Sequence, residues 1–186
     1  DDQVGTEPAG DIESLRRDQQ HVDMRTLSAN QEIVIDEING NAMEIIAEID
    51  TKDAPMVELN VLRSPNKEEF TRIAFFRERG FRNTQNHRIG SSYSLISIDS
   101  SYSSLSPDVL SRAPETGSFI IEQDETLKLR VFIDKSVVEV FVNGKQCVAL
   151  RIYPSRDDSV GISLRSQGRD AELISLDAWQ MENIYE

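Results

Sequence analysis

The feature that most constrains this chain is a two-residue alternation of apolar and polar side chains, clearest over residues 127–153. From Leu127 onward, Leu, Val or Ile occupies every second position, and mostly polar side chains lie between them. Successive side chains of a β-strand point to opposite faces of a sheet, so this period predicts strands with one buried face. A second apolar run, at 137–142, ends at Asn143-Gly144, a pair that favours the positive φ angles of a type I′ hairpin. The segment therefore predicts antiparallel strands joined by tight turns.

The same period recurs along most of the chain. Further strands are predicted at residues 43–49, 57–61, 71–76, 93–99, 160–164 and 171–179. Turn sequences separate them, among them Asn39-Gly40, which marks a tight turn after the apolar run at 32–35. About ten short strands with hardly any helix predict an all-β fold, a two-sheet antiparallel β-sandwich of the concanavalin-like jelly-roll type. No repeat of fixed length is visible, which disfavours a propeller.

Three segments depart from this period. Residues 1–17 begin as a linker containing Gly, Pro and acids and end in one or two predicted helical turns, for which Asp11 is a candidate N-cap. Residues 79–92 are rich in Arg, Asn, Gly and Ser and predict a long exposed loop. Residues 100–117 predict a second irregular segment. We therefore expect a connecting segment over 1–17 and a sandwich domain over 18–186.

Composition and charge exclude several functions. The chain has 20 basic and 33 acidic residues, a formal net charge of −13. Such a surface repels nucleic acid and anionic lipid, so neither is expected as a partner. The sequence has neither an apolar stretch of membrane-spanning length nor a recognisable signal peptide. The single cysteine, Cys147, lies in an apolar run and is expected to be a buried structural thiol. Because the chain opens without methionine, we expect a processed or excised fragment, whose compartment stays open between cytoplasmic, periplasmic and extracellular.

The residues predict no catalytic centre. His21 and His87 are far apart in sequence, and no Cys pair, calcium loop, nucleophile elbow or phosphate-binding loop is present, so we expect no metal and no cofactor. Acids are numerous enough to include a catalytic pair. Most, however, are expected to be solvated surface groups: Glu44, Glu48, Glu58, Asp157 and Asp158. Glu139 is the acid inside the most apolar run. It is expected on the outer face of its sheet or paired with Arg130 or Arg151.

A sugar site needs exposed aromatic rings beside polar groups. Trp179 closes the final predicted strand and is expected in the core. Candidates in or beside the irregular segments are Phe81, Arg82, His87, Tyr93 and Tyr102, where Arg and Asn side chains could bind hydroxyl groups beside the ring of Phe81.

One stretch resembles a known family. Leu-Lys-Leu-Arg-Val-Phe-Ile-Asp-Lys-Ser-Val-Val-Glu-Val-Phe-Val-Asn-Gly at 127–144, followed by Arg-Ile-Tyr-Pro at 151–154, resembles the C-terminal β-sandwich of glycoside hydrolase family 32. Glu13-Ser14-Leu15-Arg16 and the closing strand at 175–181 extend the resemblance over nearly the whole chain from residue 11. That family includes invertases, levanases, inulinases and related β-fructosidases; we expect a bacterial source for this chain.

The resemblance implies a division of labour within a longer protein. The family's catalytic unit is an N-terminal five-bladed propeller with Asn-Asp-Pro, Arg-Asp-Pro and Glu-Cys motifs. Here Trp179 is followed by Gln180, Cys147 follows Gln146, and no Arg-Asp pair precedes Pro. No catalytic residue is carried over, so this chain alone is expected not to be an enzyme.

What the resemblance implies instead is a non-catalytic module that covers or stabilises a propeller of the same parent chain, one hydrolysing β-fructosides such as sucrose, levan or inulin. Residues 1–17 would then lead from that catalytic domain. Two alternatives stay open: an autonomous carbohydrate-binding module, and an oligomerisation or docking surface that pairs copies of the chain.

Overall fold

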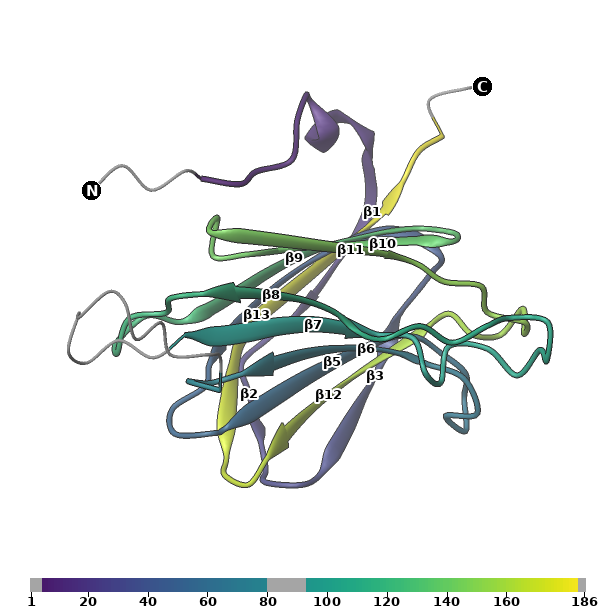
Figure 1. The fold of residues 1–186 in the computed structure, drawn as a ribbon. Helices are drawn as coiled ribbons and strands as arrows, with labels where there is room; N and C mark the ends of the chain where they lie inside the picture. The colour runs from purple at the N-terminus through teal and green to yellow at the C-terminus, as the bar shows by residue number, and fades with distance from the viewer. Residues whose placement is uncertain (1–4, 80–92, 184–186) are drawn as a thin grey trace.

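The computed structural model describes residues 5–79 and 93–183. Within them the chain forms two antiparallel sheets packed face to face, with a single 3-10 turn, η1 (Ile12–Leu15), as its only helix (Figure 1). The predicted all-β sandwich is confirmed. None of the described helical structure has the length and apolar character that crossing a membrane requires.

The larger sheet has seven strands in the order β1-β13-β4-β9-β10-β11, with β2 pairing β13 beside β1. Their bounds are β1 (Arg16–Val22), β2 (Arg25–Leu27), β4 (Ala42–Asp50), β9 (Leu127–Asp134), β10 (Val137–Val142), β11 (Gln146–Arg151) and β13 (Ala171–Met181). The smaller sheet has six strands in the order β3-β12-β5-β6-β7-β8. Their bounds are β3 (Glu32–Asn39), β5 (Met56–Arg63), β6 (Thr71–Phe76), β7 (Ser94–Asp99), β8 (Glu115–Phe119) and β12 (Gly161–Gln167).

The core lies between the two sheets and follows the alternation in the sequence. On β9 the side chains of Leu127, Leu129, Val131 and Ile133 are all buried in it. The opposing layer comes from the smaller sheet, where the ring of Phe75 on β6 packs against that of Phe119 on β8 with centroids 6.0 Å apart. Strand β5 is buried along its whole length and lies inside the smaller sheet, between β12 and β6.

The two Asn-Gly turns do different things. Asn143 and Gly144 have φ angles of +50° and +63° and join β10 to β11 in a hairpin, as predicted. Asn39-Gly40 also marks a turn, but it takes the chain from the smaller sheet into the larger one, because β3 pairs β12 whereas β4 pairs β13 and β9. A turn sequence predicts where the chain reverses, whereas packing decides which strands pair.

Two local predictions were wrong, and two strands were not predicted. The predicted irregular segment 100–117 contains the start of β8, which pairs with β7 at the edge of the smaller sheet. The first residues of the predicted sandwich form β1 and β2, whose polar edge positions hide the alternation. Asp11 does not cap η1 with its side chain; instead the Ser14 hydroxyl donates to the Asp11 carbonyl at 2.7 Å. The division of the chain at residue 17 stays a prediction.

Candidate functional site

The outer face of the larger sheet carries an unusual set of apolar groups. Side chains that alternate with the core positions on β4, β9, β10 and β13 point away from the smaller sheet. They include four that are half-buried, which we call the aromatic face: Ile46, Phe132, Phe141 and Trp179. The rings of Phe132 and Phe141 meet edge to face with centroids 6.0 Å apart. An outer sheet face that faced only water would be expected to be polar.

A buried carboxylate lies in the middle of this face. Glu44 on β4 is 0 % exposed, although it points outward. Arg16 donates two hydrogen bonds to this carboxylate, from Nε to Oε2 and from Nη2 to Oε1, both 2.8 Å long. Arg130 on β9 donates from Nε to Oε1 at 2.7 Å. The paired geometry of a guanidinium and a carboxylate makes such bonds strong and directional.

Strand register brings these three side chains together. Glu44 lies opposite Trp179 on β13 and opposite Phe132 on β9. Arg16 is the first residue of β1, the strand beside β13, so its side chain extends across Trp179 and lies 4.2 Å from the ring centroid. Arg130 lies 5.2 Å from the ring centroid of Phe132. The two guanidinium groups thus bind the carboxylate and stack on aromatic rings, a combination suited to Arg.

The electrostatic balance keeps Glu44 ionised. Burial raises the pKa of this carboxyl, but the hydrogen bonds and charges of Arg16 and Arg130 outweigh burial and lower it below its ordinary value. The bond to Glu44 correspondingly raises the pKa of Arg16. Glu13 in η1 adds a second, exposed carboxylate, 3.5 Å from Arg16 and 3.9 Å from Arg130. The cluster is a fixed structural element on the surface of the sheet.

Two acids and one aromatic residue lie elsewhere than predicted. Glu44 and Glu58 are buried, not solvated, and Glu58 accepts a hydrogen bond of 3.0 Å from Gln167. Trp179 lies on the outer face and is half-buried, because the bulge in β13 between Leu173 and Ser175 sets which side its last residues face. Glu139 is exposed on the outer face, one of its two predicted places.

A second buried carboxylate braces the loops at one end of the sandwich. Glu69 is 0 % exposed and accepts hydrogen bonds from the backbone amide of Leu105 at 2.7 Å and from the hydroxyl of Ser159 at 2.8 Å. Ser155 donates both its amide and its hydroxyl, and the amide of Arg156 adds a bond of 3.1 Å. Burial raises the pKa of Glu69, but the hydrogen bonds from Ser155, Leu105 and Ser159 outweigh it and bring the pKa to about 2. Glu69 therefore joins three loops.

The carboxyl groups with a shifted pKa all favour the ionised form. A glycosidase needs a carboxyl whose pKa is raised so that it can donate a proton near neutral pH. Wherever the pKa of a carboxyl departs from its ordinary value in the described chain, it is lowered: Glu32, Glu37, Glu44, Glu68, Glu69, Asp99, Glu125 and Asp158. These groups bind donors and stay ionised.

The surroundings of Cys147 disfavour the reactive form of its side chain. Cys147 is half-buried on β11, and burial together with the charge of Glu139 raises the pKa of its thiol. A raised pKa disfavours the thiolate, which is the nucleophilic form. Over residues 5–79 and 93–183, no group of three His, Cys, Asp or Glu side chains is arranged to hold a metal ion.

The predicted sugar-binding residues are only partly described. Phe81, Arg82 and His87 lie outside the described residues, so their role stays a prediction. Tyr93 is half-buried immediately before β7. Tyr102 is 58 % exposed and its ring stacks on Phe70 with centroids 5.2 Å apart. The Arg16–Glu44–Arg130 cluster was missed, since no short-range sequence signal links residues on β1, β4 and β9.

Fold and surface together define a structural module: a two-sheet sandwich with an apolar, ion-paired outer face. The family model "Glycosyl hydrolases family 32 C terminal" matches residues 11–180, and the chain belongs to that family. The resemblance carried by residues 127–154 is therefore confirmed.

Three curated proteins that the chain resembles are plant enzymes. The chain is 33% identical over 132 residues to fructan 6-exohydrolase of Beta vulgaris, a match that covers 67% of this chain and 20% of the relative. It is 30% identical over 131 residues to fructan 1-exohydrolase w3 of Triticum aestivum, covering 66% and 20%. The vacuolar acid beta-fructofuranosidase 2 of a Rosa hybrid cultivar is 24% identical over 210 residues, covering 96% and 31%. The chain thus spans about a fifth to a third of these proteins' length.

Solved structures share the fold. Fructan 1-exohydrolase IIa from Cichorium intybus superposes with a TM-score of 0.81 at 20% identity, covering 96% of this chain and 38% of that one. Exo-inulinase from Aspergillus awamori gives a TM-score of 0.71 at 18% identity, covering 96% and 32%. At these identities the likeness supports the fold alone.

Proposed function

We propose that this chain is the non-catalytic C-terminal sandwich of an enzyme that hydrolyses the O-glycosidic bonds of β-fructosides, and that it covers and stabilises the catalytic propeller of the same polypeptide. The family match over residues 11–180 supports the assignment to the C-terminal domain. The substrate class is taken from the named activities of the relatives, which include fructan exohydrolases and a beta-fructofuranosidase. The lowered pKa values of the buried acids support a structural role.

The aromatic face is the observation that carries the docking part of the proposal. Ile46, Phe132, Phe141 and Trp179 leave apolar surface on a sheet face that has no second layer in the described residues. Apolar surface of this kind marks the places where domains pack against one another. The hydrogen bonds of the buried Glu44 to Arg16 and Arg130 link β4 to β1 and β9, so the face is rigid before it binds a partner.

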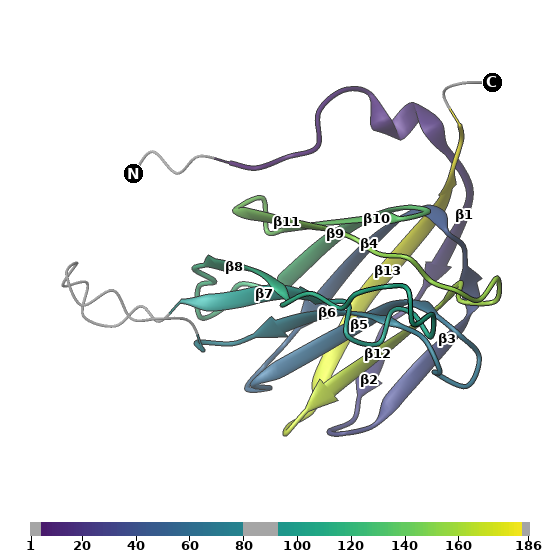
Figure 2. The same cartoon turned by 45° about the vertical axis from the view of Figure 1, so that its right-hand side comes forward.

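The path of the N-terminal segment favours the same face. The amide of Thr6 donates to the carbonyl of Gly144 in the β10–β11 turn at 2.9 Å. From there the chain runs through η1 to Arg16 on the larger-sheet side of the sandwich (Figure 2). We expect residues 1–17 to connect a preceding propeller to the sandwich, so that the propeller lies beside η1 and the aromatic face.

The test compares the chain alone with the full-length enzyme. Phe132→Ser combined with Phe141→Ser should lower the melting temperature and the activity half-life of the full-length enzyme more than it lowers the melting temperature of the 186-residue chain. Val34→Ser, at an exposed apolar position on edge strand β3, is the matched control. Equal effects in both contexts would contradict docking at this face. We expect the 186-residue chain to release no fructose from sucrose, levan or inulin, and measurable release would overturn the non-catalytic assignment.

Self-association is the competing use of the same surface. If the aromatic face pairs two copies, light scattering should show a dimer of the chain that Phe132→Ser with Phe141→Ser dissociates. A monomer whose full-length form is destabilised by the same variants would assign the face to the propeller instead.

A further inference from the structure

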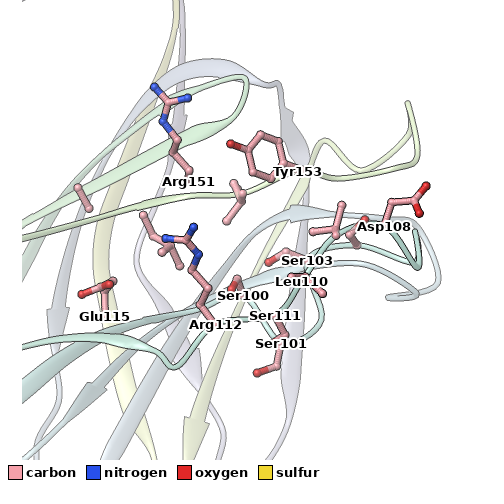
Figure 3. A pocket seen from close by; sticks show the side chains of 15 residues that line it. Ser100, Ser101, Ser103, Asp108, Leu110, Ser111, Arg112, Glu115, Arg151 and Tyr153 are labelled. Carbon is pink, nitrogen blue, oxygen red and sulfur yellow. The ribbon is translucent and has the colours of Figure 1, made fainter.

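A pocket of about 710 Å³ opens at the edge of the sandwich where β11 of the larger sheet approaches β8 of the smaller one. One wall is formed by the last residues of β11 and those that follow, including Arg151 and Tyr153. The other is formed by the segment that connects β7 to β8, including Leu110 and Arg112 (Figure 3). Its volume lies within the range of small-molecule sites in proteins.

The side chains of the two arginines of this pocket have no partner among the described residues. Arg112 and Arg151 are exposed, and their guanidinium groups form neither an ion pair nor a hydrogen bond within the described part of the chain. In a chain with 33 acidic and 20 basic residues, an arginine has many opportunities to pair. Arg16, Arg63 and Arg130, for example, all bind carboxylates. The donors of Arg112 and Arg151 are therefore available to a ligand.

Acceptors and hydroxyl groups line the same pocket. Glu115 and Asp108 contribute carboxylates, and Ser100, Ser104 and Ser111 contribute hydroxyls. Ser101 and Ser103 also line the pocket, but their hydroxyls are already bonded to Asp99 and Thr71. Arginine only donates hydrogen bonds and carboxylates only accept them, so the pair can bind the donor and acceptor sides of neighbouring hydroxyl groups. The two positive and two negative side chains balance, which disfavours an anion such as phosphate and favours a neutral polyhydroxylated ligand.

Two exposed side chains with apolar surface line the same pocket. Tyr153 is 48 % exposed and Leu110 is 84 % exposed, and both line the pocket. Tyr102 and Leu105, 58 % and 59 % exposed, lie on the same connecting segment. An exposed tyrosine ring offers a flat apolar face with a polar hydroxyl at its edge, and the C–H face of a sugar ring can pack against it.

The walls are braced before any ligand arrives. Glu69 holds the amide of Leu105 on one wall and the amide and hydroxyl of Ser155, just beyond Tyr153, on the other. The hydroxyls of Thr71 and Ser103 are 2.7 Å apart, and the carbonyl of Ser136 accepts from the amide of Ile152 at 2.9 Å. A site whose loops are already fixed loses less conformational entropy on binding.

We propose that this pocket is a non-catalytic binding site for a neutral oligosaccharide of β-linked fructose units. Arg112, Arg151, Glu115 and the serines bind its hydroxyl groups, and Tyr153 packs against a ring. The choice of fructose units rests on the proposed function, whereas the hydroxyl-binding chemistry rests on the pocket. The site would hold the polymer close to a catalytic domain elsewhere in the parent chain.

The test is titration of the 186-residue chain with short inulin and levan oligosaccharides, followed by calorimetry and by backbone amide chemical shifts. We expect millimolar or tighter binding, with shifts confined to the pocket. Arg151→Ala, Arg112→Ala and Tyr153→Ala should each weaken binding at least tenfold. Arg165→Ala is the matched control, because Arg165 lies on β12 outside the pocket lining and forms no ion pair with another described residue, and it should leave binding unchanged.

Three results would overturn the proposal. The first is no detectable binding at 10 mM oligosaccharide, a concentration roughly a thousandfold above the dissociation constant of a typical specific site. The second is binding that survives all three pocket substitutions, and the third is binding of inorganic phosphate in place of sugar. Malto-oligosaccharides are the comparison sugar, and equal affinity for them would refute the assignment to fructose units. Because docking of the propeller is tested on the aromatic face by melting temperature, failure at the pocket leaves that proposal standing, and the reverse also holds.

Discussion

The Nε atom of Arg130 on β9 lies 2.7 Å from the Oε1 atom of Glu44 on β4, on the outer face of the larger sheet. Arg16 from β1 closes the other side of the same carboxylate. One buried charge thus ties the first strand of the domain to its central strands, across β13. The energetic weight of this contact is measurable, because the domain offers a nearby glutamate for comparison.

Glu44→Gln should lower the free energy of unfolding by about 2–3 kcal/mol, because it leaves two guanidinium groups facing a neutral amide in a mostly buried site. Glu48→Gln, on the same strand and face, should cost less than about 1 kcal/mol, since Glu48 is partly exposed and its closest cation, Lys128, is 3.6 Å away. Urea denaturation of both variants measures the difference. Equal losses would show that the Arg16–Glu44–Arg130 cluster adds nothing beyond surface pairing.

Stability should fall as pH drops through the range set by Glu69. The folded pKa of Glu69 is about 2, against an ordinary value of 4.5. A carboxyl with a lowered folded pKa stabilises the fold above its unfolded pKa, and this contribution disappears as pH falls from about 4.5 to 2, a loss of about 3 kcal/mol. Glu69→Gln should remove that part of the acid dependence.

Urea midpoints measured from pH 7 to pH 2 provide the measurement. Asp157→Asn, an exposed position in the neighbouring loop, is the control and should leave the acid profile unchanged. An acid profile of Glu69→Gln that overlays that of the unmodified chain would contradict the role of Glu69 as the anchor of the three loops.

The Asn143-Gly144 turn separates backbone strain from hydrogen bonding. Asn143 has a φ of +50°, its Oδ1 atom accepts from the amide of Lys128 at 2.9 Å, and its Nδ2 atom donates to the carbonyl of Thr126 at 2.7 Å. Asn143→Ala loses these bonds and adds strain, for an expected loss of about 2–4 kcal/mol. Asn143→Gly loses only the bonds and should be about 1 kcal/mol less damaging. Thermal unfolding of the pair decides; a glycine variant as unstable as the alanine variant would leave the strain argument without support.

His21 offers a readout of the β1–β13 pairing. Its Nδ1 atom lies 2.8 Å from Asp177, and the hydrogen bond to Asp177 raises the pKa of the imidazole above 6.5. A raised pKa means that the contact stabilises the fold below the unfolded pKa and that this contribution disappears as pH rises through the folded value. Asp177→Asn should bring the pKa of His21 down, as followed by the ring proton shifts in NMR. Asp23→Asn, whose carboxylate is 3.5 Å away and exposed, should have the smaller effect.

The sequence by itself determined the fold class and most of the strands. Period-two alternation is a local property, because each side chain's face follows from its neighbours along one strand, and β6, β9 and β10 were predicted close to their observed bounds. The Asn143-Gly144 hairpin was equally local, since its positive φ angles depend on the two residues in the turn. The motif at 127–154 also sufficed to place the chain in its family.

Only the tertiary structure decided which polar residues matter. Glu44 and Glu48 occupy equivalent positions in the alternation of β4, yet the first is buried and the second is not, because Arg16 and Arg130 reach the first from other strands. The pocket likewise combines Arg112 and Arg151, which line it from two segments where the edges of two different sheets approach each other. Burial and pairing between residues distant in sequence depend on sheet order and register, and these are set by the packing of the whole sandwich.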